Sequence, residues 1–276
     1  MNVSILILTF NEEINIGSCL DTVSWSDDIV VLDSFSSDAT TRIAIDHGAR
    51  VVQRGFDNYS EQRNFGIREV AYRNEWLIMI DADERLSLAL RAEILAIVAN
   101  PPAGVTLCLM RRRDYLFGRC IRRSSGYPTW FGRLMKVGHV WVERPINEQY
   151  CTAGKTVLLQ HHLDHYPFNK GFAEWFDKHD RYSTMEAMLK FKQSGDRPRV
   201  RALISRDPLQ RRRALKALAY TLPARPLWMF MTLYIFKGGF LEGRAGLTFS
   251  LLRAWYEFMI DCKYRELRRR ERGLPV

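Results

Sequence analysis

The amino-acid sequence predicts an α/β fold, with a mostly parallel, doubly wound sheet followed by a helical C-terminal extension. Two observations support this prediction. Short apolar runs alternate with segments of helical spacing through the first hundred residues, and the connections between them are short. The apolar runs also lack the polar alternation of a half-exposed strand, which is typical of strands covered on both faces. A chain of 276 residues is long enough to build a full core.

Each element is predicted from its own pattern. β-rich apolar runs predict strands at residues 3–10, 29–32, 49–53, 76–80, 104–110 and 156–160. Helical spacing of apolar side chains predicts helices at residues 14–23, 40–47, 59–71, 87–99, 175–192 and 251–270. We expect one domain over residues 1–195, divided into halves at residue 100, and a basic, amphipathic helical region over residues 196–276.

Polar side chains gather where three of the predicted strands end. Asn11 and Glu12 follow the first strand, Asp33 follows the second, and Asp81 and Asp83 follow the strand that begins at Trp76. In an open α/β sheet, ligands bind outside the carboxyl ends of the strands, so these groups are expected to line one pocket. Clustered carboxylates are costly unless a divalent metal or a basic side chain lies between them.

The composition limits the class of partner. A formal net charge of +10 favours anionic partners, namely nucleic acid, an anionic membrane surface or phosphorylated substrates. The five cysteines are scattered without a C-x-x-C pair, which argues against a disulfide framework or a zinc site and fits a reducing cytoplasm. The sequence has neither a dinucleotide-binding glycine motif nor a P-loop motif.

Four motifs in order carry a resemblance to a known family. They are LTFNEE (residues 8–13), VLDSFSSDAT (31–40), YSEQRNFG (59–66) and IDADERL (80–86). Together they resemble glycosyltransferase family 2, and within it the bacterial lipopolysaccharide-core β-1,4-glucosyltransferases. The resemblance implies a GT-A fold, a nucleotide-sugar donor, a divalent metal (Mn²⁺ or Mg²⁺) and inversion at the anomeric carbon. It makes residues 1–100 the nucleotide-sugar half and residues 101–195 the acceptor half.

The resemblance also assigns roles to residues of the donor half. Asp33 corresponds to the acid that contacts uracil, Asp81 to the acid near the ribose, and Asp83 to the acid that holds the metal on the diphosphate. The other expected donor-binding residues line the nucleotide pocket or lie near the phosphates: Thr9, Asn11, Glu12 and Arg63.

The acceptor half contains the expected base and a further metal ligand. An inverting transfer needs a group that removes the proton of the acceptor hydroxyl. By resemblance to a Val-His-Glu-like motif we expect Glu148 to be this catalytic base, with Glu143 as the alternative, although Asn147 replaces the histidine. His165, in the tract that begins at His161, is the expected histidine ligand of the metal. An arginine-rich, aromatic stretch lies where the family binds its acceptor, and we expect acceptor contacts from Arg111, Arg119 and Arg133.

The C-terminal region is expected to associate with a membrane. Arginines cluster from Arg197 onward, and the uncharged, aromatic segment 226–236 is too short to span a bilayer but suits a helix lying in its interface. The alternative is that these helices only pack on the catalytic domain.

The leading hypothesis is an inverting, metal-dependent transferase that moves a hexose, glucose in the first instance, from a UDP-sugar to an anionic lipid-linked glycan. The expected acceptor is a lipopolysaccharide inner-core sugar, and the expected location is peripheral, at the cytoplasmic face of the inner membrane. One alternative is the same chemistry with another hexose and a polyprenyl-linked, capsule or O-antigen acceptor. A hypothesis of a different class, a basic nucleic-acid-binding protein, explains the arginines but not the acids at successive strand ends. No nucleic-acid partner is therefore expected.

Overall fold

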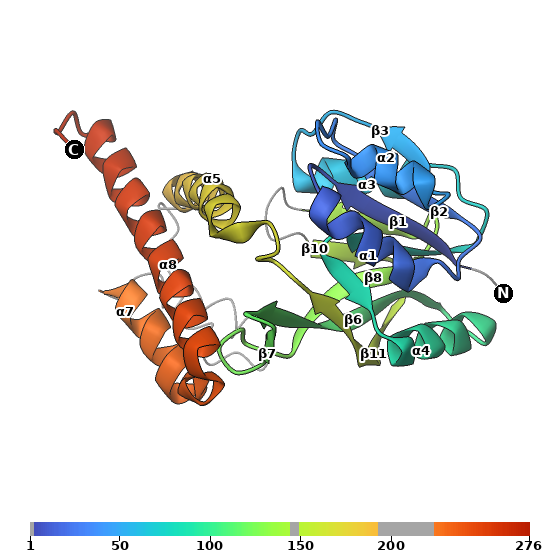
Figure 1. Ribbon diagram of the computed structural model, residues 1–276. Coiled ribbons are helices and arrows are strands. Elements are labelled where there is room, and N and C mark those ends of the chain that lie inside the picture. The colour runs from blue at the N-terminus through green and yellow to red at the C-terminus, as the bar shows by residue number, and fades with distance from the viewer. Residues whose placement is uncertain (1–2, 144–148, 193–223) are drawn as a thin grey trace. The chain divides into compact units, whose positions relative to one another are not determined.

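The structure is a computed structural model that describes residues 3–143, 149–192 and 224–276 (Figure 1). It contains two compact units. The first unit comprises Met1–Arg122 and Tyr127–Gly171, and the second comprises Arg123–Gly126 and Phe172–Val276. The boundary between the two units falls after Gly171. The predicted domain over residues 1–195 also included the helix predicted at 175–192.

Nine strands of the described chain form one mixed sheet in the order β3-β2-β1-β4-β8-β6-β11-β5, with β7 paired to β6. The predicted parallel strands are β1 (Ser4–Thr9), β2 (Ile29–Asp33), β3 (Arg50–Gln53) and β4 (Trp76–Asp81). Two strands predicted as short runs are much longer: β6 (Val105–Leu116) and β11 (Lys155–His165). The sequence did not predict five strands: β5 (Glu84–Leu86), β7 (Arg119–Ile121), β8 (Thr129–Lys136), β9 (Val140–Glu143) and β10 (Gln149–Thr152).

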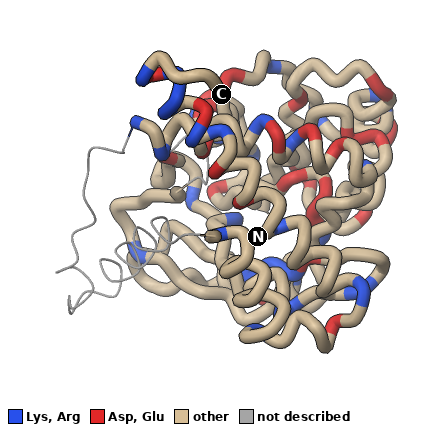
Figure 2. Tube along the Cα trace, turned by 90° about the vertical axis from the view of Figure 1, so that its left-hand side faces the viewer, with Lys and Arg blue, Asp and Glu red and all other residues tan. Residues whose placement is uncertain are grey.

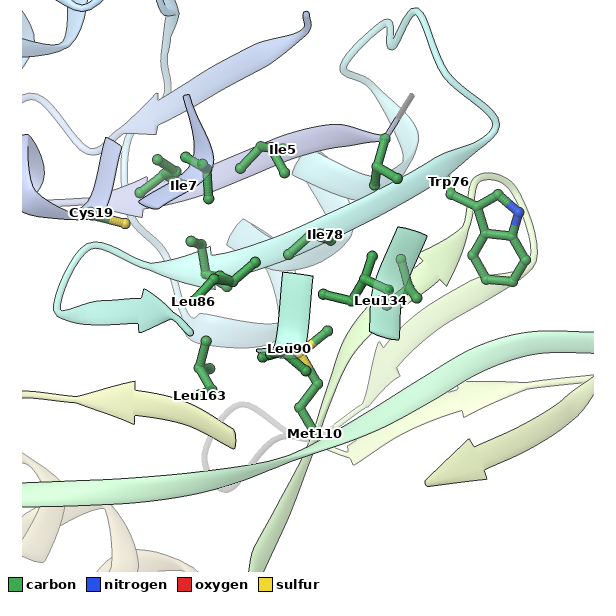
Figure 3. Close-up of a cluster of buried hydrophobic side chains, with 14 of the residues drawn as sticks. Ile5, Ile7, Cys19, Trp76, Ile78, Leu86, Leu90, Met110, Leu134 and Leu163 are labelled. Atoms are coloured by element: carbon green, nitrogen blue, oxygen red, sulfur yellow. The ribbon is translucent and has the colours of Figure 1, made fainter. Parts of the chain in front are cut away.

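Both faces of the sheet are covered by apolar side chains. One cluster contains Ile5, Ile7 and Ile78, which all lie fully buried (Figure 3). The alternate residues Leu6 and Leu77 point to the opposite face, in a second cluster. Because successive side chains of a strand point to opposite sides, two-sided burial requires the continuous apolar runs seen in the sequence.

Helices follow the strands of the first unit. They are α1 (Glu13–Val23), α2 (Thr40–Asp46), α3 (Tyr59–Arg68) and α4 (Leu88–Ala99). Side-chain caps define two of their starts: Asn58 accepts a hydrogen bond from Glu61 N, and Ser87 accepts one from Leu90 N. Helix α3 approaches β1 so closely that a Cβ on Gly66 would lie 2.4 Å from a methyl group of Leu6. The glycine of the QRNFG motif therefore sets how close α3 lies to the sheet.

The second unit is helical. It contains α5 (Gly171–Lys192, whose first residue belongs to the first unit), α7 (Arg225–Phe230), a π-helical segment η2 (Met231–Phe236), a 3₁₀ turn η3 (Gly239–Glu242) and the long helix α8 (Gly243–Glu271). The last turn of α8 carries Arg268, Arg269 and Arg270, and basic residues recur towards the C-terminus (Figure 2). Among the described residues, no helix combines the length and the apolar character that crossing a bilayer requires.

Candidate functional site

The loops after β1 and β2 are tied together by the carboxylate of Asp33. This fully buried side chain accepts hydrogen bonds from Thr9 Oγ1 (3.0 Å) and from Ser36 N (2.9 Å). Asn11 has a left-handed backbone (φ 52°), and its side-chain oxygen accepts a hydrogen bond from Ser37 N at 2.8 Å. Three expected donor-binding residues, Thr9, Asn11 and Asp33, thus belong to one hydrogen-bonded pair of loops.

Asp81, at the end of β4, is held by two arginines. Arg63 Nη2, from α3, lies 2.9 and 3.2 Å from the two carboxylate oxygens of Asp81. Arg133 Nη2, from β8, donates to Asp81 Oδ2 at 2.8 Å and to Glu84 Oε1 at 2.7 Å. Glu84 also accepts a hydrogen bond from the backbone N of Asp81 (3.0 Å) and is fully buried. Two cations therefore fix the orientation of the first acid of the D-x-D motif.

Arg133 has a different environment from the one expected of an acceptor contact. Only 2 % of its side chain is exposed, and its Nη1 donates to the hydroxyl of Tyr150 at 3.1 Å. Its hydrogen-bond partners Asp81, Glu84 and Tyr150 all lie inside the first unit. The structure thus places Arg133 against Asp81 and Glu84.

Asp83 is paired with His165, and the resemblance assigns both residues to the metal. His165 Nε2 lies 3.2 Å from Asp83 Oδ2, and His165 Nδ1 lies 2.6 Å from Asp114 Oδ1 on β6. The antiparallel pairing of β5 with β11 sets His165 opposite Glu84 and so brings the histidine to the motif. Burial and Arg112 lower the pKa of His165, but the charge of Asp83 and the hydrogen bonds to Asp114 and Asp83 outweigh them and raise it to about 9.

These two side chains fit a divalent cation as a partial ligand set. A carboxylate oxygen and an imidazole nitrogen are both ligands that Mn²⁺ and Mg²⁺ accept, and Asp83 Oδ2 and His165 Nε2 lie 3.2 Å apart. The described residues contain no group of three or more acidic, histidine or cysteine side chains arranged to hold a metal. The protein thus offers an oxygen and a nitrogen, and a diphosphate and water would complete the shell.

Asp114 and Arg112 support this pair, and sequence reasoning missed both. Arg112 Nε lies 3.2 Å from Asp114 Oδ1, and Arg112 Nη1 lies 3.8 Å from Glu84 Oε1. Burial would raise the pKa of Asp114, but Arg112 and His165 outweigh it and hold the pKa below its usual value. The one signal in the sequence was Asp114 at the end of the arginine run, a stretch from which acceptor contacts were expected.

Glu12 completes the acidic side of the site. Lys170 Nζ lies 3.1 Å from Glu12 Oε1, and Asn15 Nδ2 donates to Glu12 Oε2 at 2.8 Å. Burial and then the negative charge of Asp83 raise the pKa of Glu12. Lys170, which the sequence gave no reason to select, lies just after β11.

The remaining expected acceptor residues lie on other surfaces. Along β6, the side chains of Arg112 and Asp114 point towards His165 and Glu84, whereas those of Arg111 and Arg113 point to the other face of the sheet. There the guanidinium of Arg111 lies 5.6 Å from the ring centroid of Trp130, and Arg113 makes a two-pronged ion pair with Asp164. Arg119, on the short β7, is exposed. The structure therefore does not bring Arg111, Arg119 and Arg133 together.

The expected base, Glu148, and its neighbour Asn147 lie outside the described residues. The alternative base, Glu143, is exposed at the end of β9, where its carboxylate accepts a hydrogen bond from the Trp141 indole at 3.0 Å. Asn64 of α3 hydrogen-bonds both backbone groups of Val142 and so holds β9 against α3.

The fold and site define a class of protein. An acid-rich, arginine-braced site at the carboxyl ends of parallel strands is suited to a phosphorylated ligand and its counter-ion. The comparison with family models is more specific. The model described as Glycosyl transferase family 2 matches residues 4–212, and the chain belongs to that family. The protein is a glycosyltransferase with a GT-A fold.

Two relatives in sequence are named as glycosyltransferases, and the chain is also similar to part of one solved structure. An uncharacterized glycosyltransferase of Rickettsia typhi is 26 % identical over 99 % of this chain and 89 % of its own length. The lipopolysaccharide core biosynthesis glycosyltransferase LpsC of Rhizobium meliloti is 27 % identical over 94 % of this chain and 90 % of its own. A crystal structure of glucosyl-3-phosphoglycerate synthase from Mycobacterium tuberculosis with Mn²⁺, UDP and glucosyl-3-phosphoglycerate covers 41 % of this chain and 44 % of its own, with 23 % identity and a TM-score of 0.35.

Proposed function

We propose that the protein transfers glucose from UDP-glucose to an anionic lipid-linked glycan, a lipopolysaccharide inner-core sugar, with inversion and with Mn²⁺ or Mg²⁺ as cofactor. The observation that carries the donor part is the pairing of Asp83 with His165 beside Asp81, which Arg63 and Arg133 hold in place. The acceptor part is supported by the full-length similarity to LpsC, whose name places it in lipopolysaccharide core biosynthesis.

The chain's own residues divide the work of binding the donor. In this proposal the loops joined by Asp33 receive the uracil, and Asp81 receives the ribose, with Arg63 close to the phosphates. A divalent cation, held by Asp83 and His165, would neutralise charge on the leaving diphosphate. Glu148 would remove the proton of the attacking hydroxyl, a role that rests on the sequence resemblance alone.

The alternation of side chains along β6 refines the assignment of acceptor-binding residues. Burial and then the positive charges of Arg113, Arg111 and Arg122 lower the pKa of His162, whose Nδ1 lies 2.9 Å from the Tyr127 hydroxyl. Guanidinium groups next to Trp130 and Tyr127 combine charge with flat apolar rings, a combination suited to an acidic or phosphorylated sugar. We therefore assign Arg111 to acceptor binding and move Arg133 to the support of Asp81.

The nucleic-acid hypothesis is not favoured by these contacts. It requires arginines free to meet a phosphate backbone. Arg112, Arg113 and Arg133 are instead engaged with acids inside the first unit.

Titration calorimetry with a panel of UDP-, GDP- and ADP-sugars, with and without Mn²⁺, tests the donor. UDP-glucose should bind most tightly, and only with the metal present. Asp83→Asn should remove the effect of the metal, while Asp46→Asn, a change of an exposed acid on α2, should leave it intact. Equal binding of UDP-glucose by the Asp83 variant and the wild type, with the same metal response, would refute the assignment of the metal site.

A further inference from the structure

The turn between η2 and α8 exposes three large apolar side chains. Phe236 is 72 % exposed, Phe240 is 50 % exposed and Leu241 is 59 % exposed. We call residues 236–244 the hairpin tip. Single exposed apolar residues are common, but three within six positions form a patch that favours an apolar or interfacial partner.

The backbone of the tip holds these side chains outward. Gly238 has a left-handed conformation (φ 74°), and a Cβ on Gly239 would lie 2.7 Å from the carbonyl oxygen of Leu233. The carboxylate of Glu242 accepts hydrogen bonds from the backbone N of Arg123 and of Ser124, at 2.7 and 3.0 Å. The exposure is therefore part of an ordered turn in which the two glycines are sterically required.

The charges around the tip are positive. Lys237 and Arg244 are both exposed. Residues 224–256 contain a single acid, Glu242, and its carboxylate is occupied by the bonds just described. An apolar patch flanked by cations complements an anionic lipid surface, in which side-chain cations meet phosphate groups while aromatic rings enter the acyl boundary.

The apolar surface continues along α8. Leu247, Leu251, Trp255 and Phe258 follow one another at helical spacing, and each is between 37 and 52 % exposed. Side chains at this spacing share one face of a helix. The opposite face is used for packing within the unit, since Ala245, Leu252 and Tyr256 are buried.

We propose that the hairpin tip is the membrane-docking element of the protein: Phe236, Phe240 and Leu241 enter the interface of an anionic bilayer, with Lys237 and Arg244 at the headgroups. The exposed face of α8 then lies along the same surface. This inference deepens the membrane location expected for a lipid-linked acceptor and rests on that part of the proposed function, but it is tested without sugar donor or acceptor.

The test is sedimentation of the full-length protein with vesicles of phosphatidylethanolamine containing about a third phosphatidylglycerol. The wild type should bind these vesicles and bind pure phosphatidylcholine much less. The variant Phe236→Ser/Phe240→Ser/Leu241→Ser should bind about 100-fold more weakly, because three half-exposed apolar side chains no longer leave water on docking. The matched control is Leu88→Ser, which removes an 82 % exposed leucine from α4 in the first unit and should bind as the wild type does.

A second variant tests the charges without touching the apolar patch. Lys237→Glu/Arg244→Glu should lose most binding to the anionic vesicles and little of its weak binding to phosphatidylcholine. Circular dichroism melting should show that each variant is folded.

Three outcomes would overturn the proposal: no vesicle binding by the wild type, unchanged binding by both tip variants, or a wild-type dimer that the triple variant converts to monomer without any lipid dependence. Calorimetric binding of UDP-glucose is measured on the same samples. A wild type that binds UDP-glucose but no vesicles would remove only the docking proposal, whereas a wild type that binds vesicles but not UDP-glucose would remove only the donor assignment.

Discussion

Replacing Arg133 by glutamine should destabilise the first unit strongly. The side chain is 2 % exposed, and its Nη2 contacts carboxylate oxygens of both Asp81 and Glu84. Asp81 retains Arg63 in the variant, whereas the fully buried Glu84 retains, among the residues that the structure describes, only Arg112 at 3.8 Å as a charged partner. Removing one partner of a buried ion pair leaves an uncompensated charge, at a cost of about 3–5 kcal/mol.

Urea denaturation followed by tryptophan fluorescence measures this loss in the free energy of unfolding. Arg119→Gln, which changes an exposed arginine, is the control and should shift stability by less than about 0.5 kcal/mol. Arg133→Lys should fall between the two, because an ammonium keeps the charge but cannot reach Asp81, Glu84 and Tyr150 together.

The double variant Glu84→Gln/Arg133→Gln distinguishes the loss of the Arg133–Glu84 ion pair from a general loss of packing in the core. It should be more stable than the sum of the two single changes predicts, by about 1–3 kcal/mol. A loss below about 1 kcal/mol in Arg133→Gln, or strict additivity in the double variant, would refute the reasoning that Arg133 compensates buried acid.

Three further predictions concern the metal pair, the base and the second unit. Asp114→Asn should weaken Mn²⁺ binding, measured by electron paramagnetic resonance of the free ion, by about 10–100-fold, because the hydrogen bond that orients His165 is weakened; Asp164→Asn on the opposite face should not. Glu148→Gln should retain UDP-glucose binding but lose at least about 100-fold in transfer to an acceptor extract, and transfer at the wild-type rate would move the role to Glu143 or another acid. His179 stacks on Trp175 with ring centroids 3.6 Å apart, and burial lowers its pKa to about 4. In the unfolded chain the imidazole titrates at about 6.5. The stability that depends on a neutral His179 is therefore fully present above that pH and is lost as the pH falls towards 4. His179→Gln should therefore flatten the pH dependence of stability between these values by about 3 kcal/mol in calorimetric melts, and parallel curves for variant and wild type would contradict it.

The sequence predicted the parallel core because each of its strands is specified locally. The run Trp76–Ile80 is apolar at every position, and no distant partner is needed to recognise it. β5 and β8 lack such a signal. Glu84–Leu86 becomes a strand only because β11 pairs with it, and that pairing brings His165 to Asp83. The histidine was expected from family resemblance, not from the residues alone.

The arginine-rich stretch shows why charge was misleading. Its composition favoured an exposed basic surface, since arginine is rarely buried without a partner. Two of the partners lie far away in the sequence: Asp164 on β11 pairs with Arg113, and Glu84 on β5 lies 3.8 Å from Arg112. A strand places Arg112 and Asp114 on one face and Arg111 and Arg113 on the other. A few consecutive residues therefore contribute side chains to both faces of the sheet, and the net charge of the stretch gives no sign of this division.

The charge balance of the donor site leads to a last prediction. Within the described part of the chain, five acids meet there, Glu12, Asp81, Asp83, Glu84 and Asp114, and the basic side chains paired with them are Arg63, Arg112, Arg133, Lys170 and His165. The acids are thus already matched or, with a neutral His165, in excess by one. A nucleotide diphosphate would add negative charge to a site whose basic side chains are already paired with acids. Its binding should therefore require a cation that enters with it. In calorimetry, EDTA should abolish the binding of UDP, while uridine, which carries no phosphate, should bind equally with and without the chelator. Tight UDP binding in EDTA would show that side-chain cations alone hold the diphosphate and would remove the argument for a divalent cofactor.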